Sequence, residues 1–259
     1  MSEIHPTAVV SPKARMGNCS KVGPYAVVGD GVTLGEGSEV MAHACLLGPA
    51  TIGRENVFYP FCSIAGPAQD LKYRGEPSTV VIGDHNVFRE YVTVNRGTVG
   101  GQGVTRIGSH NFLMAYVHIA HDCVVGDHTI FGNAATLAGH VIVEDYANVG
   151  AFCAIHQFCR VGTHGFLGGG TIITQDVLPF SKTVAPRDSR VFGPNTPGLE
   201  RRGFSPERIR AIQAAFRLLC RSKLNTSQAV AKIRETLNHS EDVEVLLRFI
   251  ESSERGFIR

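Results

Sequence analysis

The chain contains no tryptophan, no CxxC pair and no run of 18 or more apolar residues. Without such a run a transmembrane helix is excluded, and the opening residues lack the basic and then apolar pattern of a secretory signal. Seven scattered cysteines indicate reduced thiols rather than a disulfide framework. We therefore expect a cytoplasmic protein without a membrane anchor.

A strong charge of either sign is also missing. The net charge of +2 is too small to indicate a nucleic acid as partner. Residues 199–259 carry 12 Lys and Arg against 8 Asp and Glu, whereas residues 1–198 carry 13 against 15. The C-terminal part is thus the basic one, and its charge is either a solvated helical surface or an attraction for an acidic carrier protein.

What the sequence does have is a period of six. Every sixth residue is apolar from Ile4 to Ile64, again in the short run Ile82, Phe88 and Val94, and again from Ile107 to Ile173, which gives 26 hexads. This period predicts an all-β left-handed parallel β-helix, in which each hexad forms one face of a triangular coil. The residue after the apolar one is often Gly, as at Gly17 and Gly35, and we expect it to supply positive φ angles.

Two interruptions of the period predict loops that leave the prism. The first is GPAQDLKYRGEPST between Ile64 and Ile82, and the second is RGTVGGQGVTR between Val94 and Ile107. Loops on a regular scaffold often carry function.

The C-terminal part has another composition. A connection rich in Pro and Gly follows Ile173, and helix starts at Ser205, Thr226 and Ser240 predict helices over 205–221, 227–238 and 241–253. We expect a hexapeptide-repeat domain over residues 1–190, and a connection with a small helical domain over residues 191–259.

Candidate chemistry lies in a group of histidines. Seven of the eleven histidines fall between His110 and His164. A coil of 18 residues places six residues in adjacent columns, with His118 at their edge; the six are His121, Asp122, Gly139, His140, His156 and Gln157. Such a patch suits activation of a hydroxyl or amine by a histidine base, with a backbone N–H stabilising an oxyanion.

The histidines and cysteines also allow other interpretations. Clustered histidines also bind zinc, so a metal site is the rival interpretation of the patch. We expect His128 and His164 to be surface residues. The other five histidines form no constellation in the sequence; they are His5, His43, His85, His110 and His239. Cys62, Cys123, Cys153 and Cys159 occupy the small position of the hexad, so packing explains them.

Six segments together resemble one known family. They are DLKYRGEP (70–77), VNRGTVGGQG (94–103), AHDC (120–123), ATLAGHV (135–141), HQFCRVG (156–162) and GLERRGF (198–204). They are similar to the bacterial UDP-N-acetylglucosamine O-acyltransferases, the first enzymes of lipid A synthesis, and the similarity covers essentially the whole chain. The resemblance implies that a homotrimer transfers an (R)-3-hydroxyacyl chain from acyl carrier protein to the glucosamine 3-position of the UDP-sugar, without cofactor or metal.

The resemblance also implies roles for single residues. His121 is then the general base, Asp122 its partner, and the Gly139 amide the oxyanion donor. Substrate-binding roles fall on Asp70, Lys72, His118, His140, His156, Gln157, Asn195, Arg201 and Arg202.

Gly169 corresponds to the family's acyl-chain ruler. It lies about 2.7 coils beyond His121, roughly 13 Å along the axis at ~4.8 Å per coil. This separation predicts a long donor of about the hydroxymyristoyl class.

Two departures from the family pattern leave the acceptor open. Asn95 stands where many members have His, and Pro197 stands where some have an acidic residue. The alternatives are the same reaction on a 3-amino UDP-sugar, which gives an amide, and an acetyl-CoA-dependent sugar acetyltransferase of the same fold. The related N-acyltransferases of lipid A synthesis carry an extra N-terminal domain, whereas here the hexads begin at Ile4. A non-catalytic trimeric scaffold would not need the histidine patch.

Overall fold

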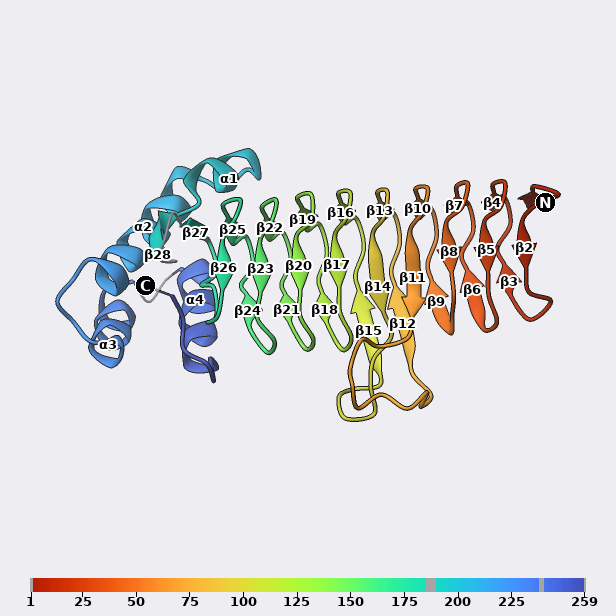
Figure 1. Cartoon of the computed structure of the whole chain (residues 1–259). Coiled ribbons are helices and arrows are strands. Elements are labelled where there is room, and N and C mark those ends of the chain that lie inside the picture. Colours follow the sequence, from red (N-terminus) through yellow and green to blue (C-terminus); the bar gives the residue numbers. More distant parts are fainter. Residues whose placement is uncertain (1, 185–189, 238–239, 259) are drawn as a thin grey trace.

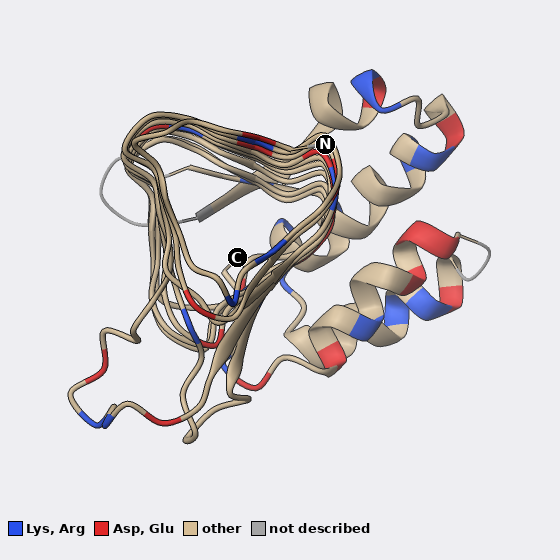
Figure 2. Ribbon diagram, turned by 90° about the vertical axis from the view of Figure 1, so that its right-hand side faces the viewer, with Lys and Arg blue, Asp and Glu red and all other residues tan. Residues whose placement is uncertain are grey.

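The computed structural model describes residues 2–184, 190–237 and 240–258. Three parallel sheets form a long prism, and helices gather at its C-terminal end (Figure 1). Figure 2 shows the triangular outline of the prism in a view along its length. The fold is the left-handed parallel β-helix with a small C-terminal helical domain that the hexads predict.

Successive coils add parallel strands to each sheet in turn, and sheet A ends with the antiparallel pair β27 and β28. Sheet A contains β1 (Glu3–Ile4), β4 (Lys21–Val22), β7 (Glu39–Val40), β10 (Val57–Phe58), β13 (Val87–Phe88), β16 (Phe112–Leu113), β19 (Ile130–Phe131), β22 (Asn148–Val149), β25 (Phe166–Leu167), β27 (Ser181–Val184) and β28 (Arg190–Pro194). Sheet B contains β2 (Val9–Val10), β5 (Val27–Val28), β8 (Cys45–Leu46), β11 (Ser63–Gly66), β14 (Thr93–Asn95), β17 (His118–Ile119), β20 (Thr136–Leu137), β23 (Ala154–Ile155) and β26 (Ile172–Ile173). Sheet C contains β3 (Arg15–Met16), β6 (Val32–Leu34), β9 (Ala50–Ile52), β12 (Thr79–Ile82), β15 (Val104–Ile107), β18 (Val124–Val125), β21 (Ile142–Val143) and β24 (Arg160–Val161).

The second residue of most strands is the aliphatic residue of the hexad, and it points into the prism. Ile64, Ile119 and Leu137 are fully buried there. The four cysteines at the small hexad position are buried as well, as expected from packing, and burial raises the pKa of the Cys62 thiol to about 12. These thiols are therefore packing groups.

The glycines after the aliphatic residue are needed for a reason other than the positive φ angles that the sequence predicts. Gly17, Gly23 and Gly35 do not have positive φ angles. A Cβ on Gly23 would lie 2.9 Å from the backbone nitrogen of Ala42 in the next coil. Close approach of successive coils therefore requires glycine there.

Positive φ angles occur instead at the three corners, three residues before the inward aliphatic residue. Asp122, His140 and Tyr146 have φ angles of 59°, 63° and 60°. We call the corners A–B, B–C and C–A after the sheets that they join. Each corner therefore presents a column of outward side chains with a spacing of 18 residues.

Aromatic rings and imidazoles form stacks of five and six rings along two of these corners. On the A–B corner the stack is Tyr25, His43, Phe61, Tyr91 and Tyr116. On the C–A corner it is His85, His110, His128, Tyr146, His164 and Phe180. His128 and His164 lie on the outside of the prism, as predicted, but their rings are half-buried in this stack, which the sequence does not predict.

Both predicted loops are present, and both leave the B–C corner. The first joins β11 to β12 and the second joins β14 to β15, and the two project together from the prism (Figures 1 and 2). Arg96 connects them, because its guanidinium donates to the hydroxyl of Tyr73 at 3.2 Å.

The helical domain contains α1 (Thr196–Arg201), α2 (Pro206–Cys220), α3 (Thr226–Thr236) and α4 (Glu241–Glu251). Ser205 and Ser240 are N-caps, as predicted. The cap of α3 is Asn225 rather than Thr226, because its side chain forms a capping box with Gln228. The expected end of this helix at residue 238 lies outside the described residues.

Helix α1 was not predicted, since Pro197 and Gly198 are typical of a connection. Pro at the start of a helix is nevertheless compatible with it. The apolar core of the helices continues into the prism end through Leu178 and Phe180. The expected domain division after residue 190 falls inside β28, which pairs antiparallel with β27. None of the helices in the described ranges is long and apolar enough to cross a membrane.

Candidate active site

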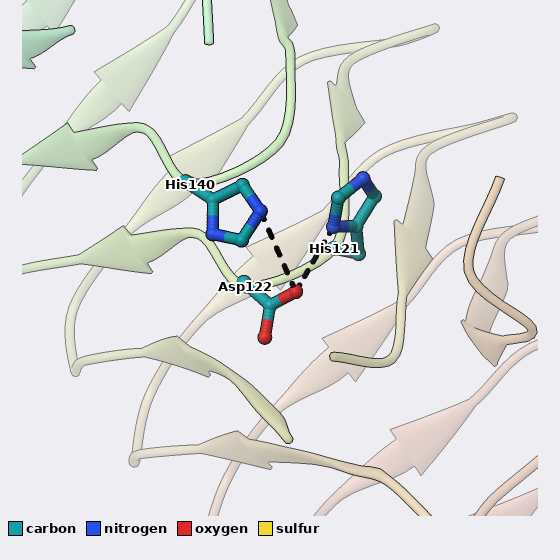
Figure 3. Close-up of side chains that lie close together, drawn as sticks. All are labelled: His121, Asp122 and His140. Carbon is teal, nitrogen blue, oxygen red and sulfur yellow. Dashed lines mark hydrogen bonds and ion pairs between the residues drawn. The ribbon is translucent and has the colours of Figure 1, made fainter. Parts of the chain in front are cut away.

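His121 and Asp122 form a hydrogen-bonded pair at the B–C corner. The Nδ1 atom of His121 lies 2.9 Å from the Oδ2 atom of Asp122 (Figure 3). The carboxyl of Asp122 is fully buried, and the imidazole of His121 is 13% exposed. Because a carboxylate only accepts, Nδ1 carries the proton, and Nε2 keeps a lone pair to act as a base.

The second loop holds the Asp122 carboxylate. The Thr98 hydroxyl donates to Oδ2 at 2.7 Å, and the backbone N–H groups of Thr98 and Gln102 also donate to the carboxylate. Burial alone would raise the pKa of Asp122, but the hydrogen bonds from Thr98, His121 and Gln102 outweigh burial and lower it. The carboxylate is thus ionised beside His121.

Gly97 and Gly101 let this loop approach the carboxylate closely. A Cβ on Gly97 would lie 2.8 Å from Oδ1 of Asp122, and one on Gly101 would overlap the carboxyl group. Sequence reasoning missed Thr98 and Gln102 as site residues. The signal was available, since their glycine-rich loop leaves the same corner one coil before His121.

Gly139 lies directly against the imidazole of His121. A Cβ there would be 2.5 Å from Cε1 and 2.6 Å from Nε2 of that ring. Within the described part of the chain, the Gly139 N–H has no hydrogen-bond acceptor. Its position beside a free imidazole nitrogen suits it to stabilise an oxyanion.

His140 and His118 flank the pair. The ring of His140 meets that of His121 edge-on at 5.1 Å and stacks on Phe158 at 4.6 Å. His118 shares a hydrogen bond of 2.7 Å with the Thr93 hydroxyl, and burial, with His121 nearby, lowers its pKa. Both imidazoles therefore border the dyad as the column arithmetic predicts.

His156 and Gln157 lie at the same corner two coils beyond His121, and both are exposed. Gly169 lies elsewhere, at the A–B corner between β25 and β26. The predicted separation of Gly169 from His121 therefore covers only the axial part, because the width of sheet B also lies between them.

Asn195, Arg201 and Arg202 come together at the C–A corner rather than at His121. They line a pocket of about 560 Å³ together with Tyr146 and His164. The Arg202 guanidinium lies 4.4 Å from the centre of the Tyr146 ring. Sheet C thus separates these three residues from His121 within one chain.

Asp70 and Lys72 lie on the first loop, away from the prism wall. The Asp70 carboxylate accepts a hydrogen bond of 2.9 Å from the Lys72 backbone, and the Lys72 side chain is exposed. The first loop leaves the same B–C corner of the prism at which His121 lies.

A metal site is the rival interpretation of the His121–Asp122 pair. The ligand atoms of His121, Asp122 and His140 lie within 4.8 Å of one another. However, Asp122 already accepts hydrogen bonds from Thr98, Gln102 and His121, and a metal would have to displace the last of these. The donor set therefore suits a histidine base better than an ion.

Comparison with known proteins decides the family. A family model described as UDP-N-acetylglucosamine O-acyltransferase, domain 2, matches residues 176–258, and a bacterial transferase hexapeptide model matches residues 105–139. Two relatives named acyl-[acyl-carrier-protein]--UDP-N-acetylglucosamine O-acyltransferase are each 52% identical. The alignment with the Stenotrophomonas maltophilia protein covers 99% of this chain and 97% of that protein. The alignment with the Thiobacillus denitrificans protein covers 100% of both chains. The chain belongs to the UDP-N-acetylglucosamine O-acyltransferase family.

Solved structures of UDP-N-acetylglucosamine O-acyltransferases have the same fold over the whole chain. The Acinetobacter baumannii enzyme superimposes with a TM-score of 0.95 at 38% identity, with 99% of each chain covered. The Arabidopsis enzyme does so with a TM-score of 0.86 at 30% identity, covering 99% of this chain and 100% of its own. The family assignment from sequence motifs is confirmed.

Proposed function

We propose that the protein transfers an (R)-3-hydroxyacyl chain from acyl carrier protein to the 3-hydroxyl of UDP-N-acetylglucosamine, the first step of lipid A synthesis. The observation that carries the proposal is the His121–Asp122 pair beside the Gly139 amide, which has no acceptor among the described residues, within a chain that is about half identical to enzymes of this name.

In the proposed mechanism His121 is the general base. Its Nε2 atom takes the proton of the attacking hydroxyl while the oxygen adds to the thioester carbonyl. Asp122 stabilises the imidazolium that forms, and the Gly139 N–H donates to the oxyanion. The intermediate collapses with loss of the carrier thiolate, which takes the proton from His121.

The proposed enzyme is a homotrimer whose sites lie between subunits. The residues around His121 and those around Arg202 lie on separate corners, and sheet C separates them within one chain. A site that uses both groups therefore needs two subunits. A stripe along the A–B corner supports it as well, since Tyr25, Tyr116 and Phe152 are 59%, 60% and 71% exposed. Exposed apolar surface of this extent is typical of an interface.

These two features favour one arrangement of the trimer. With the A–B corners at the threefold axis, sheet B of one subunit faces sheet A of the next. The B–C corner carrying His121 then lies beside the neighbour's C–A corner carrying Arg202. The nucleotide would bind the neighbour's Asn195, Arg201 and Arg202, with Asp70 and Lys72 from the first loop.

One observation favours a second acceptor, the 3-amino UDP-sugar. The buried Oδ1 atom of Asn95 has no hydrogen-bond partner within the described residues, although its Nδ2 donates to the Pro67 carbonyl at 2.8 Å. An amine offers one more N–H donor than a hydroxyl, and an unpaired buried acceptor is costly.

The test is to supply the purified protein with hydroxyacyl carrier protein and both UDP-sugars, and to identify the product by mass. We expect the 3-O-ester, and turnover that falls by ~10² to 10⁴ in His121→Ala with an unchanged oligomeric mass. An amide as the main product would establish the second acceptor. Near-normal turnover of His121→Ala would exclude His121 as the base.

A further inference from the structure

The two loops at the B–C corner carry different parts of the proposed site. The first loop carries Asp70 and Lys72, and the second holds the Asp122 carboxylate through Thr98. Arg96 lies at the start of the second loop, directly after β14 and two residues before Thr98. The contacts of Arg96 therefore show how the two loops are placed relative to each other.

The base of the first loop is fixed to the start of the second. The Arg96 N–H donates to the carbonyl of Gly66, the last residue of β11, at 2.9 Å. The Asn95 side chain donates to the Pro67 carbonyl at 2.8 Å. These two bonds hold the beginning of the first loop but do not reach its tip.

The Arg96 guanidinium reaches the tip. Its Nη1 atom donates to the Gly48 carbonyl, which lies at the same corner in the coil before the first loop, and its Nη2 atom donates to the Tyr73 hydroxyl at 3.2 Å. The Tyr73 hydroxyl donates onward to the Glu76 carbonyl at 3.2 Å. Arg96 thus anchors Tyr73 to the prism through a planar group that spans two acceptors, which the single nitrogen of a lysine cannot do.

Tyr73 closes the turn that carries Asp70 and Lys72. The Tyr73 N–H donates to the Asp70 carbonyl at 3.0 Å, and the Lys72 N–H donates to the Asp70 carboxylate at 2.9 Å. The turn gains little from packing, because Leu71 within it is 95% exposed. Its position therefore depends on the bond between Arg96 and Tyr73.

We propose that Arg96 is a positioning residue for the acceptor. Through Tyr73 it fixes the turn whose Asp70 and Lys72 bind the UDP-sugar. The same segment continues into Thr98, which holds the partner of the base, so one loop aligns the acceptor with the group that deprotonates it. The inference rests on the proposed transfer to a UDP-sugar. It adds two residues, Arg96 and Tyr73, that act through the turn rather than on the reacting atoms.

The experiment measures kcat and KM for the UDP-sugar with a fixed hydroxymyristoyl-acyl carrier protein donor. Tyr73→Phe removes only the hydroxyl that links Arg96 to the turn. We expect KM to rise about tenfold, as for loss of a hydrogen bond to a charged group, and kcat to change less than about twofold. Arg96→Lys should show the same change, because it keeps the charge without spanning both acceptors. Tyr59→Phe also removes a hydroxyl, at the A–B corner, and should leave both constants unchanged.

A double-mutant cycle with Lys72→Ala tests the path of the effect. If Arg96 acts through the turn, Tyr73→Phe should raise KM only about threefold or less in the Lys72→Ala background, because a group that the turn positions is already missing.

Several results would overturn the inference. An unchanged KM in Tyr73→Phe, the same rise in Tyr59→Phe, an undiminished rise in the Lys72→Ala background, or parent-like constants in Arg96→Lys would each do so. A fall in kcat with unchanged KM would assign Arg96 to Asp122 instead of the turn. All of these results leave the proposed function standing. A parent protein that converts no UDP-sugar would refute the proposed function, and the inference with it.

Discussion

Asp122 combines a strained backbone with a fully satisfied side chain. Its φ of 59° belongs to the left-handed region, which costs a non-glycine residue on the order of 1 kcal/mol. The hydrogen bonds from Thr98, Gln102 and His121 hold the carboxylate in place despite its burial. At this corner the strain aims the carboxylate at the imidazole that we propose as the base.

Thr98 should act on catalysis through Asp122. Thr98→Val removes the O–H that helps to keep the pKa of Asp122 low, so the carboxylate becomes harder to ionise and is lost as the partner of His121 at a higher pH. We predict that the acid limb of the pH profile of kcat/KM moves up by about one pH unit. Thr98→Ser keeps the hydroxyl and should restore the profile; a profile that stays in place in Thr98→Val would restrict Thr98 to holding the loop.

Gly169 should set the length of the acyl chain. It is exposed, and a Cβ there would lie 3.2 Å from the Ala151 carbonyl oxygen, a contact that a small shift relieves. Gly169→Met should therefore fold normally and place its side chain over the A–B corner. The space left for the acyl chain would then be shorter. Competition between donors of different length should show preference moving to shorter chains, and an unchanged preference would place the ruler elsewhere.

At the scale of elements, the six-residue repeat predicts most of the fold. A strict period of six determines which residue of each strand points inward, so the prism, both loops and the histidine column at the B–C corner follow from counting. The positive φ at the corners and the stacks of rings did not follow, because they depend on contacts between coils rather than on the hexad itself. Helix α1 was missed because its first turn holds Pro197 and Gly198.

His164 illustrates such a contact between coils. Its ring stacks on Tyr146 at 4.7 Å and meets Phe204 edge-on at 4.9 Å, where the prism joins the helical domain. Burial, and then the nearby Arg202, lower the pKa of His164 to about 4. The folded protein therefore holds this imidazole neutral well below its ordinary pKa of 6.5.

This pKa shift predicts a stability that depends on pH. The unfolded chain binds the proton first, so the contribution of His164 is complete above pH 6.5 and is lost as the pH falls toward 4. Over this pH range the free energy of unfolding of His164→Phe, measured in urea, should change by about 1–3 kcal/mol less than that of the parent protein. His5→Phe, at an exposed position near the other end of the prism, is the control. Equal pH slopes in both variants and the parent would refute the assignment.

At the scale of the whole molecule, the two groups of candidate site residues lie on different corners of one prism. The sequence predicts both groups through the family resemblance, but column arithmetic gives only the group around His121. The residues Asn195, Arg201 and Arg202 follow the last coil, so no count of 18 relates them to the dyad. Only the folded helical domain shows that they sit at the C–A corner.

Mixing of subunits tests the shared site most directly. His121→Ala and Arg202→Ala should each be inactive alone, since every interface then lacks one of the two groups. When equal amounts are unfolded together and reassembled at random, one interface in four pairs an intact His121 with an intact neighbouring Arg202. We expect recovery of about one quarter of the parent activity. Activity no higher than that of the separate variants, in mixed trimers confirmed by mass, would contradict it.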